Sequence, residues 1–192
     1  MTLFNNKYRI ESARLNGWDY SSPGYYFVTI CTHDRKQILS EIINGQVRLT
    51  PIGLIINEEW LRTGTIRENV ALHEYVIMPN HLHGIIQIKP YGSTSDSVEI
   101  AVETSCHGVS TGNTWENAQP DKCHWKPGVL GAIVGQFKIQ VSKRARSGGY
   151  HDFRWQPRFH DHIIRDSGEL YRIRHYIIEN PKQWKKDRLN RQ

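Results

Sequence analysis

Short apolar stretches bounded by turn residues alternate along this chain with longer stretches in which apolar residues recur every three or four positions. The short stretches predict strands, and the helical spacing predicts amphipathic helices. The sequence Asn44-Gly45 between two apolar runs predicts a tight hairpin within 38–50. Strands are predicted at 25–31, at 71–78, at 82–88 and within 153–164, and helices at 51–62, at 129–145 and from Asp166 to Asn180.

The order of these elements is strand, helix, two strands, helix, strand and an appended helix. This order predicts an α+β fold of the ferredoxin-like or RRM-like kind, in which helices cover one face of an antiparallel sheet. The other face is expected to be open to a ligand. We expect one domain over 1–192, with an irregular arm at 1–24. Residues 91–127 are rich in Ser, Thr, Gly and Asn, so we expect a flexible insertion there.

Basic residues predominate in the last third of the chain. The net charge is +6 and the pI is near 9.3, and both favour a polyanionic partner. No apolar run approaches the roughly 20 residues that span a bilayer, and no signal peptide is evident. We therefore expect a cytoplasmic protein with no membrane partner.

Three cysteines, Cys31, Cys106 and Cys123, are widely spaced and predict no disulfide framework. Two of them precede a histidine, but neither pair has the second Cys or His at the spacing of a zinc site.

Two histidines stand on the predicted strand that follows Pro79-Asn80. Side chains alternate between the faces of a strand, so His81 and His83 point the same way and Leu82 points to the opposite layer. Two neutral imidazoles on one face are half of a metal site.

The last predicted helix offers the other half. Tyr176 and Asn180 are four residues apart, about 40° around a helix, whereas Tyr171 lies roughly 140° away from Tyr176. An amide oxygen suits Mg²⁺ or Mn²⁺, and a neighbouring tyrosine is a candidate nucleophile. Taken alone, Tyr176 also fits an aromatic in a helix seam, and Asn180 before Pro181 also fits a helix terminator.

Three segments in order, MPNHLHGII, WQPRFHDHIIRD and HYIIENP, resemble the HUH single-tyrosine endonucleases, specifically the REP-associated tyrosine transposases. The resemblance covers nearly the whole chain outside the insertion. It implies that His81, His83 and Asn180 hold a divalent metal, Mg²⁺ or Mn²⁺. It further implies that Tyr176 attacks a phosphodiester of single-stranded DNA, giving a 5′-phosphotyrosine link and a free 3′-hydroxyl. The expected substrates are single-stranded DNA hairpins, and the protein is expected to act as a monomer or a homodimer.

Basic and aromatic side chains supply candidate DNA contacts. Trp18, Trp125 and Trp155 can stack on bases, although Trp155 also suits a core. His160 and His162 repeat the spacing of the histidine pair, and His162 matches a histidine of the family segment without being an expected ligand. The candidate phosphate contacts are Lys138, Arg144, Arg154, Arg158, His162, Arg165 and Arg174.

The main alternative is a catalytically silent binder of structured single-stranded nucleic acid on the same sheet face. An RRM module for RNA is disfavoured because its characteristic aromatic sequences are absent from the central strands. A histidine-triad hydrolase needs a third alternating histidine where this chain has Ile85. The base that deprotonates the tyrosine is not evident from the sequence.

Overall fold

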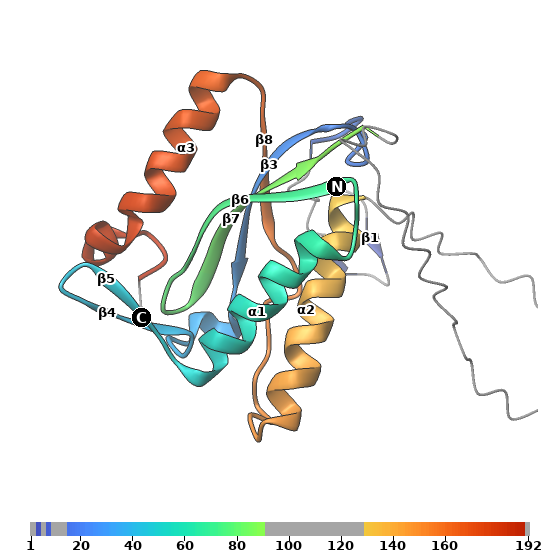
Figure 1. Cartoon of the computed structure of the whole chain (residues 1–192). Coiled ribbons are helices and arrows are strands. Elements are labelled where there is room, and N and C mark those ends of the chain that lie inside the picture. The colour runs from blue at the N-terminus through green and yellow to red at the C-terminus, as the bar shows by residue number, and fades with distance from the viewer. Residues whose placement is uncertain (1–2, 5–6, 9–14, 91–128, 191–192) are drawn as a thin grey trace, which may run out of the picture.

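The computed structural model describes residues 3–4, 7–8, 15–90 and 129–190 (Figure 1). The predicted insertion at 91–127 and residues 1–2, 5–6 and 9–14 of the predicted N-terminal arm lie outside the described residues. Among the described residues, no helix combines the length and the apolar character needed to cross a membrane.

A four-stranded antiparallel sheet forms the centre of the molecule, in the order β6-β7-β3-β8. With the two intervening helices this gives the predicted ferredoxin-like topology, so the predicted fold class is confirmed. The fourth predicted strand is shorter than the apolar stretch 153–164: Phe153 and Trp155 enter the core from irregular chain instead. The strands are β3 (Gly24–Cys31), β6 (Val70–Ile77), β7 (His81–Ile88) and β8 (His160–Ile164).

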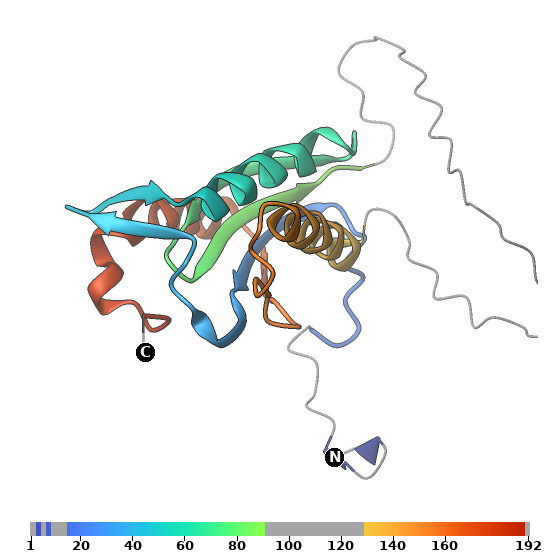
Figure 2. The same cartoon turned by 90° about the horizontal axis from the view of Figure 1, so that it is seen from below.

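Helices α1 (Pro51–Thr65) and α2 (Leu130–Ser147) cover one face of the sheet (Figures 1 and 2). The side chain of Thr50 caps the start of α1 by accepting a hydrogen bond from Gly53 N, and Pro51 follows as its first residue. Trp60 of α1 is fully buried against β7, where a Cβ built on Gly84 would lie 2.4 Å from the indole ring. The absence of a side chain at Gly84 thus brings helix and strand into direct contact.

Helix α3 (Ser167–Glu179) lies on the opposite face, at the left of Figure 1, and runs into a short 3₁₀ segment, η2 (Asn180–Lys186). A small apolar cluster of Ile85, Ile164 and Ile177 holds it to the sheet. The prediction that this face is open is therefore wrong over the part that α3 covers. The appended helix is confirmed, and it folds back on the sheet because its apolar stripe requires burial.

The predicted hairpin is present as β4 (Ser40–Ile43) and β5 (Gln46–Leu49), next to the start of α1. Asn44 and Gly45 both have positive φ, as a tight turn between twisted strands requires. Two further strands, β1 (Leu3–Phe4) and β2 (Lys7–Tyr8), pair with each other near the N-terminus.

Candidate active site

The two strand histidines lie side by side on the α3 face of β7, as their spacing predicts. Their ring centroids are 4.4 Å apart, and both side chains are buried. Leu82 between them points into the main core on the other face. The strand itself is central in the sheet and paired on both edges, so the backbone of the pair is rigidly placed.

Each imidazole is oriented by a neighbour at its Nδ1 atom. His81 Nδ1 lies 2.7 Å from Asn80 Oδ1, and Asn80 Nδ2 donates to Leu189 O, which fixes the direction of that amide. His83 Nδ1 lies 2.8 Å from Thr29 Oγ1. A proton on Nδ1 puts the lone pair of each ring on Nε2, toward the end of α3, which is the tautomer found in metal-binding histidines.

The end of α3 brings Tyr176 and Asn180 to the same place. The Tyr176 hydroxyl lies 3.2 Å from His83 Nε2, and the phenol ring packs edge-on against Phe27. Asn180 is buried, and its Oδ1 atom has no hydrogen-bond partner. Tyr171 is 70 % exposed and lies elsewhere on the helix, as its angular offset predicts.

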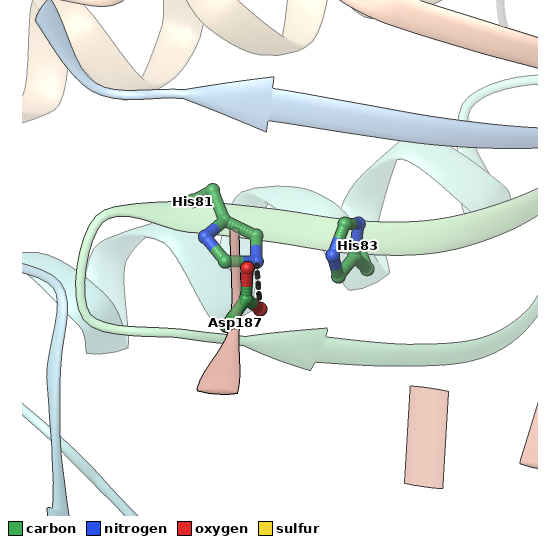
Figure 3. Close-up of side chains that lie close together, drawn as sticks. All are labelled: His81, His83 and Asp187. Carbon is green, nitrogen blue, oxygen red and sulfur yellow. Dashed lines mark ion pairs between the residues drawn. The ribbon is translucent and has the colours of Figure 1, made fainter. Parts of the chain in front are cut away.

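A fifth side chain, Asp187, joins His81, His83, Tyr176 and Asn180, and it was not predicted from the sequence (Figure 3). Its Oδ2 atom lies 3.8 Å from His81 Nε2, while Oδ1 accepts a hydrogen bond from Leu189 N. The ligand atoms of His81, His83 and Asp187 all lie within 4.8 Å of one another. Asp187 is the one acidic residue after Glu179, in a segment that is otherwise strongly basic. This isolated acidic residue was the sequence feature that could have indicated a further ligand.

The donor set fits a divalent metal. Three buried polar atoms at this point lack a hydrogen-bond partner: His81 Nε2, Asn180 Oδ1 and Asp187 Oδ2. Such atoms are costly to bury unless something satisfies them. Two imidazoles, an amide oxygen and a carboxylate are ligands that Mn²⁺ and Mg²⁺ accept, and their convergence accounts for the three unsatisfied atoms together.

Burial sets the protonation state of the site. It lowers the pKa of His81 to about 3, with a further contribution from the positive charge of Arg35. Burial and the neighbouring His81 also hold the pKa of His83 well below its usual value. Burial raises the pKa of Tyr176, and the Asp187 carboxylate adds to that effect. At neutral pH the imidazoles are free to bind a metal, and the phenol carries its proton.

The cluster opens onto a cavity of about 1160 Å³ between α3, η2 and the ends of β3 and β8. Four basic residues, Arg35, Arg158, Lys186 and Arg188, line it together with the carboxylates of Glu179 and Asp187. A mainly basic cavity around a candidate metal-ligand cluster suits a phosphate-bearing substrate.

The turn that carries Arg35 is strained. Asp34 and Arg35 both have φ of 53°, a left-handed conformation that costs a non-glycine residue roughly 1–2 kcal/mol. Buried Thr32 stabilises the turn, because its hydroxyl contacts the carbonyl oxygens of Lys36 and Asn80. The same Asn80 orients His81, so the turn is tied to the candidate metal centre.

The predicted phosphate contacts do not gather at one place. Several of them are neutralised by carboxylates of the fold: Arg144 pairs with Glu58 and Glu59, Arg174 with Glu74, and His162 with Glu169. Arg165 is exposed near the start of α3.

The remaining candidates line two separate hollows. Arg158 lines the cavity at the candidate active site, whereas Lys138 and Arg154 line a groove beside α2. Trp155 is buried in the core and Trp18 is 41 % exposed, while Trp125 lies outside the described residues. His160 also lines the cavity.

Comparison with known proteins places the fold. No family model matches the chain. It is 32 % identical over 182 residues to an uncharacterised protein of Haemophilus influenzae, a match that covers 93 % of this chain and 92 % of that protein. A solved REP-associated tyrosine transposase bound to a REP hairpin gives a TM-score of 0.52 at 18 % identity, over 96 % of this chain and 74 % of that one. A candidate transposase of Deinococcus radiodurans gives a TM-score of 0.38 at 15 % identity, over 88 % and 98 % of the two chains.

The resemblance drawn from the three sequence segments is confirmed at the level of the fold. The chain belongs to the same family as the Haemophilus influenzae protein and has the fold of the REP-associated tyrosine transposase.

Proposed function

We propose that this protein is a metal-dependent single-stranded DNA endonuclease and strand transferase that acts on hairpin-forming repeat DNA. The observation that carries the proposal is the Tyr176 hydroxyl, 3.2 Å from His83 Nε2 and beside three unsatisfied metal-ligand atoms. The choice of hairpin DNA is supported by the fold shared with a transposase solved on a REP hairpin.

Four side chains have roles in holding the divalent ion, Mg²⁺ or Mn²⁺: His81, His83, Asn180 and Asp187. A bound ion would neutralise phosphate charge and help to orient the scissile bond. Asn80 and Thr29 are positioning residues, because each contacts the Nδ1 atom of one histidine. Arg35 faces the same cavity and is placed to neutralise a phosphate of the substrate.

Tyr176 has the role of nucleophile. Its phenolic oxygen attacks the phosphorus, a new bond forms between them, and the bond from phosphorus to the 3′-oxygen of the preceding nucleotide breaks. The departing 3′-oxygen takes up a proton, and the phenol loses one. The product is a 5′-phosphotyrosine link and a free 3′-hydroxyl. A phenolate is a good leaving group, so a DNA 3′-hydroxyl can reverse the step, which gives strand transfer.

The resting phenol competes with metal binding at one atom. When His83 carries its proton on Nδ1, Nε2 accepts a hydrogen bond from Tyr176, and the same lone pair cannot also ligate an ion. Tyr176 is 47 % exposed and already lines the cavity, so a substrate there can reach its hydroxyl. Attack then requires the phenol to leave His83 and face the phosphate.

The test is a denaturing gel of the protein with labelled single-stranded hairpin DNA from its own genomic neighbourhood, in Mn²⁺ and in chelator. Tyr176→Phe removes one oxygen and keeps the packing on Phe27, and Tyr171→Phe is the matched control on the exposed side of α3. We expect a metal-dependent protein–DNA adduct that Tyr176→Phe abolishes and Tyr171→Phe retains. Cleavage by Tyr176→Phe would contradict the assigned nucleophile. Tight binding without an adduct on any flanking sequence would favour the silent binder.

A further inference from the structure

A second basic feature lies outside the candidate active site. It is a groove of about 700 Å³ between α2 and the chain that follows it, which we name the α2 groove. Its basic lining residues are Lys138, Lys143, Arg146 and Arg154, and no Asp or Glu lines it. In Figure 1 this part of the chain runs beside the lower half of α2 and then leads into β8.

The charges of the α2 groove are not balanced within the fold. In the part of the chain that the structure describes, Lys143, Arg146 and Arg154 are exposed and form no ion pair. Arg144 on the same helix differs, because Glu58 and Glu59 of α1 neutralise it. The fold thus neutralises Arg144 and leaves the other basic residues of the α2 groove without a carboxylate partner among the described residues.

A lysine at the floor of the α2 groove adds to this imbalance. The ammonium of Lys138 is half-buried and donates to the carbonyl oxygens of Gln156 and Pro157, with no carboxylate partner among the described residues. A half-buried cation without a counter-ion is unfavourable in the free protein. An anionic ligand in the groove would remove that cost.

The spacing of these residues suits a row of phosphates. Lys138, Ser142 and Arg146 follow one another at four-residue intervals, so they form a ridge about 12 Å long on one side of α2. Duplex DNA carries one charge per about 1.7 Å of its axis, so several phosphates lie within the reach of such a ridge.

The lining chemistry favours a double-helical stem over unpaired bases. Single-strand sites present aromatic faces on which bases stack. Trp155, the one aromatic residue of the α2 groove lining, is 7 % exposed, and Ile139 is the exposed apolar side chain there. The α2 groove therefore offers contacts to phosphates and no stacking platform.

The α2 groove adjoins the candidate active site. Gln156 lines both the groove and the cavity that holds the metal-ligand cluster, and Lys138 fixes its carbonyl. We propose that the α2 groove binds the phosphate backbone of the DNA stem while the adjoining single strand enters the cavity, an inference that rests on the proposed function for the identity of the ligand.

Binding rather than cleavage tests this inference. The probe is a fluorescent DNA hairpin with a 12-base-pair stem and a single-stranded tail, and the tail alone is the comparison probe. Anisotropy is measured over a series of salt concentrations in chelator, with every variant built on Tyr176→Phe so that no adduct forms. Lys143→Ala/Arg146→Ala removes two groove charges, and Arg48→Ala/Arg172→Ala removes two exposed charges elsewhere as the matched control.

We expect the groove variant to bind the hairpin about tenfold more weakly at low salt, and its log–log salt slope to be less negative by about 1.8 for two lost contacts. The affinity of the groove variant for the tail alone and its melting temperature should remain unchanged. The control variant should bind the hairpin as tightly as the parent protein. The inference is overturned if the hairpin affinity is unaffected, if tail and hairpin lose affinity equally, or if the control variant loses as much. It is also overturned if an RNA hairpin of the same sequence binds more tightly and depends equally on the groove. None of these outcomes requires cleavage. The binding test of the α2 groove and the adduct test of the proposed function can therefore fail independently of each other.

Discussion

The carboxylate of Asp187 lies 3.8 Å from Nε2 of His81, and neither Asp187 Oδ2 nor His81 Nε2 has a hydrogen-bond partner. Asp187 directly follows η2 and His81 begins the central strand β7, so the two residues are 106 positions apart in sequence. Since the pKa of His81 is about 3, the imidazole is neutral at pH 7 and the contact is not an ion pair. A cation between the two atoms would satisfy both.

Asp187→Asn is therefore expected to weaken Mn²⁺ binding by about tenfold or more, since it removes the charged oxygen ligand. Without metal, the free energy of unfolding should stay the same or rise. The reason is that the substitution removes a negative charge without a cationic partner from a nearly buried position. Isothermal titration with Mn²⁺ and the metal-dependent rise in Tm give the two readouts. Asp152→Asn, at an exposed carboxylate, is the matched control. Unchanged affinity in Asp187→Asn would remove this residue from the ligand set.

Arg35 and Asp34 separate strain from function, because both have φ of 53° but only Arg35 lines the cavity. Glycine adopts this conformation freely, so each of Arg35→Gly and Asp34→Gly should change the free energy of unfolding by between zero and about +1 kcal/mol. Arg35→Gly should lower the cleavage rate by about tenfold, while Asp34→Gly should retain it. Urea unfolding and the adduct assay measure the two effects. Equal activity of both variants would show that Arg35 has no role toward the substrate.

Acid should destabilise the metal-free protein through the histidine pair. Burial lowers the folded pKa of His81 to about 3, and that of His83 is also lowered, while an unfolded histidine titrates near 6.5. The unfolded state therefore binds more protons, so stability is fully present above about pH 6.5 and falls as the pH drops toward 3. Each histidine contributes a slope of about 1.4 kcal/mol per pH unit in this window.

Urea unfolding in chelator at several pH values measures that slope, and His81→Gln should flatten it by one histidine's share. His151→Gln, at an exposed histidine, serves as the control. A His81→Gln variant with the same pH dependence as the parent would contradict a buried, neutral His81.

Gly84→Ala should destabilise the protein by about 1–3 kcal/mol, since its Cβ would overlap the Trp60 ring in a packed core. Trp60→Phe in the same background frees space and should recover part of the loss, although alone it also destabilises. A double-mutant cycle from urea unfolding gives the coupling of the two residues. Additive effects would mean that the strand shifts away from α1 without resistance.

The sequence predicts the elements well where local signals agree with tertiary packing. The hairpin turn at Asn44-Gly45, the helix start at Pro51 and the strand pair around Pro79-Asn80 are confirmed. Turn geometry and strand alternation depend on only a few neighbouring residues, so the sequence is sufficient to predict them. Within the apolar stretch 153–164, only the last five residues form a strand. The prediction was too long because apolar side chains are buried equally well by irregular chain, as Phe153 and Trp155 are.

The candidate site divides in the same way. Helical and strand spacing place Tyr176 beside Asn180, and His81 beside His83, but only the folded chain shows that η2 returns Asp187 to them. Charge alone likewise does not reveal that Glu59 neutralises Arg144 while Arg146 has no such partner among the described residues. Contacts between residues far apart in the sequence depend on the whole fold, so they cannot be predicted from the type and local spacing of the residues.

The two halves of the candidate site rest on supports of unequal stiffness. The histidines stand on β7, which is paired on both edges and backed by the main core, whereas α3 buries Ile177 alone in a cluster of three isoleucines. Amide protons of α3 should therefore exchange with solvent sooner than those of β7, through local openings that leave the sheet intact. Tyr176 can thus move away from His81 and His83 by a motion of α3 alone, at a free-energy cost well below that of unfolding the protein.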